Sequence, residues 1–158
     1  MRKCEIWANN AWFAVRDNDE LRRRYFRTDS HKHIKSVQHS YHLIEEACDI
    51  TNDNIPFRCE SSTSLCTSRR GKSLSAFVYD DKDKVYLCPG FFRGELYFNA
   101  LTLIHELSHL KSIRGTEDYG EGYGIEKVRS LGKEERLMDA DTFGYFAREA
   151  GTGVRLLY

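Results

Sequence analysis

The chain has 158 residues with 24 basic and 24 acidic side chains, so its formal charge at pH 7 is zero. This balance differs from the basic excess that is usual in nucleic-acid-binding proteins, and no apolar stretch is long enough to span a membrane. Apolar residues make up 41% of the chain, which supports one hydrophobic core and a single domain over residues 1–158, and argues against intrinsic disorder.

The first third of the chain is predicted to be helical. Apolar residues recur at helical spacing in residues 5–26 and 30–49. Asp29 or Ser30 is a suitable N-cap for the second of these helices. The sequence therefore predicts two helices joined by a short turn.

The middle of the chain changes to a pattern typical of short strands. Phe57, Ala76–Tyr79 and Val85–Leu87 are the β-type runs. The charged run 80–83 lies between the last two and predicts a hairpin turn.

Helical spacing returns in the last third, over residues 97–113 and again around 125–131 and 136–149. The segment 115–124 contains four glycines, at positions 115, 120, 122 and 124, and must be a loop. Helices, a small sheet and then more helices make a mostly helical α+β domain.

The clearest chemical signal is the run His105-Glu106-Leu107-Ser108-His109, an HExxH motif. On a helix, residues i and i+4 lie on the same face, so both imidazoles can reach one zinc ion. Glu106 lies one step round the helix, where its carboxylate can take a proton from an attacking water. We therefore expect His105 and His109 to be zinc ligands and Glu106 to be a general base.

A catalytic zinc site needs a third protein ligand and an open coordination position. The metzincin spacing is absent from the sequence. Glu135, with Asp139 four positions later, fits the ExxxD spacing of a gluzincin. Asp118 is the other candidate, because the glycine-rich loop can turn the chain back towards the metal. The residues by themselves leave both candidates open.

The motif and the following run Gly115-Thr116-Glu117-Asp118 resemble the aspzincin peptidases, which comprise deuterolysins and lysine-specific metalloendopeptidases. The signature of that family is HExxH followed by GTxDxxYG. Similarity extends to Ala76–Tyr79, to Val85–Cys88 and to the run Leu137-Met138-Asp139-Ala140-Asp141 with Tyr145-Phe146. The resemblance thus covers nearly the whole chain.

The resemblance implies a zincin-like fold with a small sheet or hairpin before the active-site helix. It implies one Zn²⁺ ion per chain, held by His105, His109 and Asp118. The implied reaction is hydrolysis of internal peptide bonds of a protein or peptide substrate by a zinc-activated water.

A tyrosine that stabilises the oxyanion of the tetrahedral intermediate is also implied by the resemblance. In the family it lies three positions after the aspartate, but here position 121 is Glu and the Tyr-Gly pair is Tyr123-Gly124. A two-residue insertion in the loop accounts for the shift. Tyr123 is therefore the expected donor, and Tyr119 is the alternative.

Lysine-specific members form an acidic S1′ pocket from an aspartate and a glutamate three residues later. Asp141 matches the aspartate, but Gly144 stands where the glutamate would be. We expect Asp141 to line this pocket, without strict selection for lysine. A structural or helix-capping carboxylate is the alternative for Asp141.

The five cysteines hint at disulfides and an oxidising compartment. The pairing in the family implies Cys4–Cys59 and Cys66–Cys88, with Cys48 free, although the spacing of the central cysteines allows partners to exchange. We expect an extracellular or otherwise exported protein, even though the N-terminal residues lack the apolar segment of a signal peptide.

No nucleic-acid or membrane partner is expected, and the protein is expected to be a monomer. Three alternative functions stay open: a gluzincin-type peptidase with Glu135 as third ligand, a secreted proteolytic toxin, and a non-catalytic binding module on a zincin scaffold. The intact Glu106 argues against the binding module.

Overall fold

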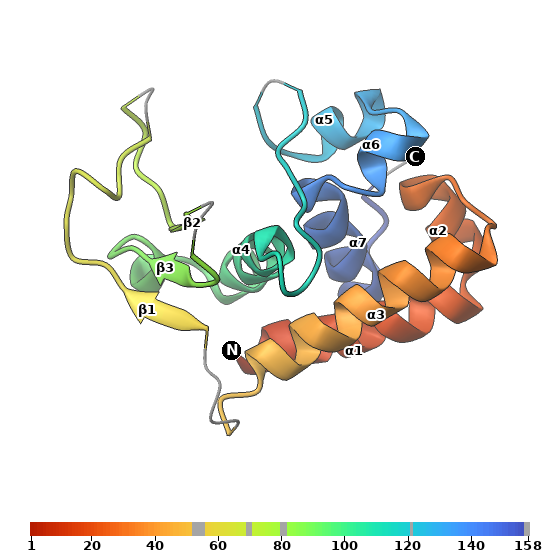
Figure 1. Cartoon of the computed structure of the whole chain (residues 1–158), viewed down its shortest axis with the longest axis horizontal. Helices are drawn as coiled ribbons and strands as arrows, with labels where there is room; N and C mark the ends of the chain where they lie inside the picture. The colour runs from red at the N-terminus through yellow and green to blue at the C-terminus, as the bar shows by residue number, and fades with distance from the viewer. Residues whose placement is uncertain (52–55, 69–70, 80–81, 121, 157–158) are drawn as a thin grey trace.

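The structure is a computed structural model that describes residues 1–51, 56–68, 71–79, 82–120 and 122–156. This part of the chain is mostly helical with one small sheet, as predicted. The helices are α1 (Arg2–Asp17), α2 (Asp19–Phe26), α3 (His31–Cys48), α4 (Leu96–His109), α5 (Ile125–Ser130), α6 (Lys133–Arg136) and α7 (Ala140–Thr152). Helix α4 lies between the sheet and α7 (Figure 1). Within the described ranges, no helix is both long and apolar enough to cross a membrane.

The sheet has the strand order β1-β3-β2 in the described residues, namely β1 (Phe57–Cys59), β2 (Ala76–Val78) and β3 (Val85–Leu87). The central strand β3 pairs parallel to β1 and antiparallel to β2, which confirms the predicted hairpin. Asp80 and Asp81 of the predicted turn lie outside the described residues. In the described residues, strand β2 is an edge strand, and it contacts α4, the helix that carries the two motif histidines.

The helix predicted over residues 5–26 is in fact two helices, α1 and α2, separated by Asn18. The Asn18 side chain accepts a hydrogen bond of 3.0 Å from the backbone N–H of Leu21 and thereby caps α2. Asparagine favours such a cap over a position inside a helix, because its side chain satisfies an N–H that would otherwise lack a partner. The apolar periodicity continues through this break and therefore did not reveal it.

An aromatic cluster holds α7 in the centre of the helical layer, where α7 packs against α1, α2 and α4. Phe26, Tyr41, Phe143 and Phe146 are fully buried and contact one another through their rings. The hydroxyl of Tyr41 donates a 2.9 Å hydrogen bond to the carbonyl oxygen of Phe143. Because burying large aromatic side chains stabilises a core strongly, this cluster gives the start of α7 a defined position beside α4.

The disulfides differ in part from the pairing that the resemblance implies. Cys4 bonds to Cys48, and Cys59 is exposed with a free thiol, so the expected Cys4–Cys59 bond and the expected free Cys48 are both wrong. The packing of α1 against α3 brings Cys4 and Cys48 to a Cα–Cα distance of 5.9 Å, whereas Cys59 lies on strand β1. Cys66 and Cys88 are bonded, as expected.

Candidate metal centre

Helix α4 presents the two motif histidines to a cleft because its opposite face is buried. Leu103, Leu107 and Leu110 are at most 2% exposed and form the packed side of the helix. His105 and His109 project from the other face, one turn apart. The periodicity of α4 therefore decides which way the imidazoles point.

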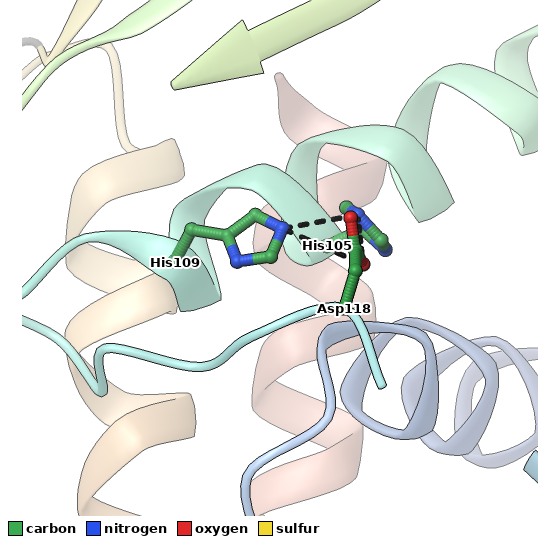
Figure 2. A group of neighbouring side chains, drawn as sticks. All are labelled: His105, His109 and Asp118. Atoms are coloured by element: carbon green, nitrogen blue, oxygen red, sulfur yellow. Dashed lines mark hydrogen bonds and ion pairs between the residues drawn. The ribbon is translucent and has the colours of Figure 1, made fainter. Parts of the chain in front are cut away.

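Three side-chain atoms converge at one point in front of α4. The Nε2 atoms of His105 and His109 lie 3.2 Å apart. Oδ1 of Asp118 lies 3.4 Å from Nε2 of His105 and 3.8 Å from Nε2 of His109 (Figure 2). Within the described part of the chain, these three residues form the group of potential ligands that could hold a metal ion.

Asp118 reaches this point because the loop after α4 turns back at Gly115 and is then fixed by two backbone hydrogen bonds. Gly115 has φ of 68°, a left-handed conformation that glycine adopts without strain, and it turns the chain back after α4. The N–H of Glu117 then donates to the carbonyl of Met138 at 2.8 Å, and the N–H of Ala140 donates to the carbonyl of Glu117 at 3.1 Å. This parallel bridge places Asp118 beside the start of α7 and opposite the histidines.

Each imidazole is oriented by an acceptor at its other nitrogen. Nδ1 of His105 lies 2.9 Å from Oδ1 of Asp141, and Nδ1 of His109 lies 2.8 Å from the carbonyl oxygen of Thr116. An ionised carboxylate and a carbonyl only accept, so both Nδ1 atoms carry the proton. The Nε2 lone pairs are therefore free for a cation, as is usual for histidines that bind metals.

The charges around the site also favour a cation. Burial by itself lowers the pKa of His105, but the hydrogen bond to Asp141 and the charges of Glu106 and Asp118 outweigh it and raise the pKa to about 9. The surroundings of His105 therefore favour a positive charge at this site. The pKa of Glu106 is raised by burial, although the two histidines oppose the shift. A carboxylate of raised pKa is a stronger base, which suits proton abstraction.

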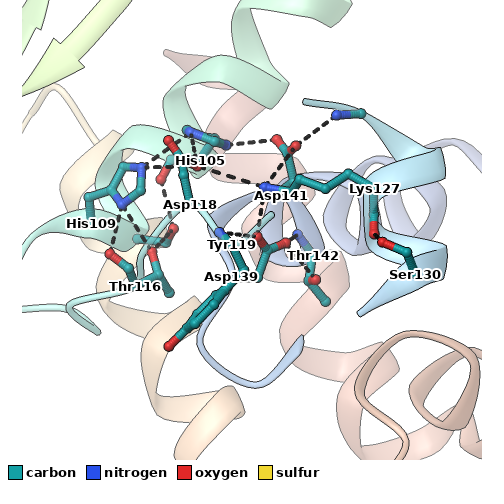
Figure 3. A network of polar contacts seen from close by, with 12 residues as sticks. His105, His109, Thr116, Asp118, Tyr119, Lys127, Ser130, Asp139, Asp141 and Thr142 are labelled. Carbon is teal, nitrogen blue, oxygen red and sulfur yellow. Dashed lines mark hydrogen bonds and ion pairs between the residues drawn. The ribbon is translucent and has the colours of Figure 1, made fainter. Parts of the chain in front are cut away.

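A second layer of charge lies behind the histidines. The sequence pointed to Asp141, either for the S1′ pocket or as a structural carboxylate, but gave no role to Lys127. Asp141 is 3% exposed, and its Oδ2 accepts a 2.7 Å hydrogen bond from the N–H of Gly124. Nζ of Lys127 lies 2.8 Å from Oδ1 of Asp139 and 3.4 Å from Oδ2 of Asp141 (Figure 3). A lysine on a short helix usually has a solvated side chain, so position 127 carried no signal in the sequence.

The two candidate tyrosines are placed differently. The Tyr123 ring lies 5.9 Å from the His105 ring, and the residue lines the cleft and is 70% exposed. Loss of solvent on one side and the nearby charge of Asp118 raise the pKa of Tyr123, so its hydroxyl stays protonated and can donate. Tyr119 contributes its backbone N–H to Asp139, and its ring points away from the histidines (Figure 3). The geometry thus favours Tyr123, the first choice from the sequence.

Glu135, the alternative third ligand, has a different task in the structure. Its Oε2 accepts a 2.6 Å hydrogen bond from the N–H of Gly132 at the start of α6. This is the glutamate half of a capping box, which stabilises a helix N-terminus. Glu135 is not among the residues that converge on the histidines. The arrangement therefore favours Asp118.

The cleft in front of the site is large and is bounded on one side by strand β2. Its volume is about 1190 Å³, and its lining includes Ala76–Tyr79, Phe98, Leu101 and the three converging residues. Pockets for small molecules usually measure about 300–1,000 Å³. The cleft is thus large for a small-molecule pocket and open enough for a polypeptide segment.

Comparison with known proteins connects this geometry to one family. The aspzincin family model, described as lysine-specific metallo-endopeptidase, matches residues 11–148. A neutral protease 2 homologue of Phaeosphaeria nodorum is 30% identical over 94% of this chain and 43% of its own length. An extracellular protease of Aeromonas hydrophila is 31% identical over 89% of this chain and 40% of its own length. The chain therefore spans less than half the length of these relatives.

The fold is also that of a solved peptidase. A zinc peptidase from Grifola frondosa superposes with a TM-score of 0.71, with 21% sequence identity, and covers 94% of this chain and 90% of its own. This similarity confirms the zincin-like α+β fold expected from the sequence. Since the family model matches most of the chain, the protein belongs to the aspzincin family of metallopeptidases.

Proposed function

We propose that this chain is the catalytic domain of a zinc-dependent metalloendopeptidase. The observation that carries the proposal is the convergence of His105, His109 and Asp118 beside Glu106, at the floor of a large cleft. Membership of the aspzincin family supports the same reaction class. The reaction is hydrolysis of internal peptide bonds in a protein or peptide substrate.

The donor set fits one zinc ion per chain. Tetrahedral zinc with bonds of about 2.0–2.2 Å places its ligand atoms about 3.3–3.6 Å apart. The corresponding separations here are 3.2, 3.4 and 3.8 Å. Two imidazoles and one carboxylate leave a position open for water or substrate, as catalytic sites require. When bound, zinc would supply Lewis-acid chemistry that polarises the peptide carbonyl and makes water more acidic.

The residues around the donor set have separate tasks in this proposal. Glu106 takes a proton from the attacking water and later passes it to the departing amine. Tyr123 donates its hydroxyl hydrogen to the carbonyl oxygen as that oxygen gains negative charge. Asp141 acts through His105, because it holds that imidazole in the tautomer that leaves Nε2 free.

An extended peptide can bind along β2. This strand lines the cleft, and within the described part of the chain it pairs with β3 along only one of its two edges. The free backbone groups of an edge strand readily pair with an added peptide strand. Such pairing positions a main chain regardless of its side chains, which suits an endopeptidase.

We further propose that the protein acts outside the cell. One of its relatives is named an extracellular protease, and the chain carries two disulfides in its described residues. A secreted toxin would use the same chemistry and would differ only in its target. A gluzincin-type site is less favoured, because Glu135 is engaged at the start of α6.

The decisive experiment compares the wild-type chain with Glu106→Gln. Both proteins should bind one equivalent of zinc, while Glu106→Gln should cleave casein at least about 100-fold more slowly, since general-base catalysis typically contributes at least that factor. The matched control is Glu126→Gln, which removes an exposed carboxylate on α5 and should keep full activity. Casein cleavage at the wild-type rate by Glu106→Gln would contradict the proposal. A wild-type protein that binds zinc and peptide but never cleaves would indicate a binding module.

A further inference from the structure

Lys127 is a buried cation beside the proposed zinc site, and the proposed catalytic steps do not use it. Its side chain is 3% exposed. Its Nζ lies 2.8 Å from Asp139, 3.4 Å from Asp141 and 3.9 Å from Asp118 (Figure 3). The ammonium group therefore lies among three carboxylates, one of which is a proposed zinc ligand.

Both oxygens of the Asp141 carboxylate already have partners inside the protein. Its Oδ1 is occupied by Nδ1 of His105, and its Oδ2 by the N–H of Gly124 together with Lys127. A basic side chain entering the cleft would meet a carboxylate that is already neutralised. It would also approach a fixed ammonium group of the same charge, which repels it.

Position 144 offers no second carboxylate. Gly144 is buried in the contact between α7 and α4, where a Cβ would lie 3.4 Å from the carbonyl oxygen of Leu101. The apolar residues Phe98 and Leu101 line the cleft instead. The two positions that form the acidic S1′ pocket in lysine-specific members thus offer no free carboxylate in this chain.

We propose that Lys127 is a specificity-determining residue: it neutralises Asp141 from inside the protein, so that the cleft accepts an uncharged side chain after the cleaved bond and does not select lysine. The inference rests on the proposed peptidase function and deepens it by naming the substrate class. It sets this chain apart from the matching family model, which is described as lysine-specific.

Removing the Lys127 charge would leave both neighbouring carboxylates with hydrogen-bond donors. Asp139 keeps two 2.8 Å hydrogen bonds from the backbone N–H and the hydroxyl of Thr142. Asp141 keeps its contacts with His105 and Gly124. In Lys127→Met, Asp141, which lines the cleft, would no longer be neutralised from inside the protein and could attract an ammonium group carried by the substrate.

The test uses two peptides that differ only after the cleaved bond, where one has lysine and the other norleucine, its uncharged analogue. The measured quantity is the ratio of kcat/KM for lysine to that for norleucine. The ratio cancels any difference in the fraction of active enzyme. For the wild type it should be at or below about 1, and Lys127→Met should raise it at least tenfold. Lys127→Gln should raise it as well.

The matched control is Lys133→Met, which removes an exposed lysine on α6 and should leave the ratio unchanged. A wild-type ratio above ten would overturn the inference without any variant. So would a ratio in Lys127→Met within twofold of the wild type.

A binding measurement separates this inference from the proposed reaction. In the Glu106→Gln background, fluorescence anisotropy gives the ratio of Kd values for the same two peptides, with and without Lys127→Met. If Lys127→Met shifts the ratio of Kd values towards tighter binding of the lysine peptide, but the wild type cleaves neither peptide, the proposed peptidase function is wrong and the role of Lys127 is supported. If the wild type cleaves the peptides but Lys127→Met shifts neither the kcat/KM ratio nor the Kd ratio, only the proposed role of Lys127 is wrong. Failure of both peptides to bind would overturn both.

Discussion

The carboxylate of Asp141 lies 2.9 Å from Nδ1 of His105, although the two residues are 36 positions apart in the chain. Helix α7 carries the acceptor and α4 carries the imidazole, so the packing of these two helices orients a proposed zinc ligand. The tautomer of His105, and with it the lone pair on Nε2, depends on this contact.

Asp141→Asn should weaken zinc binding by about 10–100-fold, the usual cost of losing an outer partner of a metal-binding histidine. The amide keeps the shape of the side chain but removes the charge that supports the imidazole. Competition with a zinc chelator at fixed pH measures the affinity. Glu149→Gln, a change at another buried carboxylate on α7, is the control and should bind zinc as tightly as the wild type. Equal zinc affinities in the wild type and both variants would contradict the role of Asp141 in orienting His105.

The identity of the third ligand is tested by Asp118→Ala against Glu135→Ala. Asp118→Ala should lose zinc during dialysis, with an affinity loss larger than the about 10–100-fold expected for an outer residue. Glu135→Ala should keep its zinc, because Glu135 caps α6. Elemental analysis of the dialysed proteins gives the result. Retention of zinc by the first variant and loss by the second would establish Glu135 as the ligand instead.

Tyr123→Phe should lower kcat by about 10²–10³-fold with little change in KM, because its hydroxyl is expected to contact the substrate oxygen mainly in the transition state. Tyr119→Phe should stay close to the wild type, since its ring points away from the histidines. Both variants should retain zinc. If Tyr119→Phe were the slower enzyme, Tyr119 and not Tyr123 would be the donor to the substrate oxygen.

Glu149 should make the stability of the fold depend on pH. Burial raises the pKa of Glu149, but the N–H of Leu156, the guanidinium of Arg24 and the hydroxyl of Tyr25 outweigh this and lower it below the ordinary 4.5. The folded state therefore favours the ionised form. The resulting stabilisation is present above pH 4.5 and is lost as the pH falls through the lowered value.

Glu149→Gln should lower the free energy of unfolding by roughly 2 kcal/mol at pH 7, a typical value for hydrogen bonds to a charged group. The difference from the wild type should shrink as the pH falls below 4.5. Urea denaturation in the presence of a chelator measures it without the contribution of bound metal. A difference that is constant between pH 7 and pH 3 would show that the charge of Glu149 does not stabilise the fold.

Local periodicity was sufficient to predict the part of the site that lies on one helix. His105, Glu106 and His109 are within one turn, and the apolar stripe behind them decides which face is buried. The hairpin of β2 and β3 follows from short β-type runs in the same way. The break at Asn18 was missed because the apolar repeat runs through it.

The position of Asp118 beside the two histidines depends on contacts between segments that are distant in the sequence, and so do the contacts of Asp141 with Lys127. The bridge between Glu117 and Asp139 brings the glycine-rich loop to the start of α7, and α5 brings Lys127 to Asp141. The pairing of Cys4 with Cys48 likewise follows from how α1 packs against α3. By itself the sequence therefore determined the helix that bears the motif and the chemistry it can carry, because those depend on near neighbours. Only the tertiary structure decided which distant carboxylates, and which ammonium group, surround it, because those positions result from the packing of whole helices.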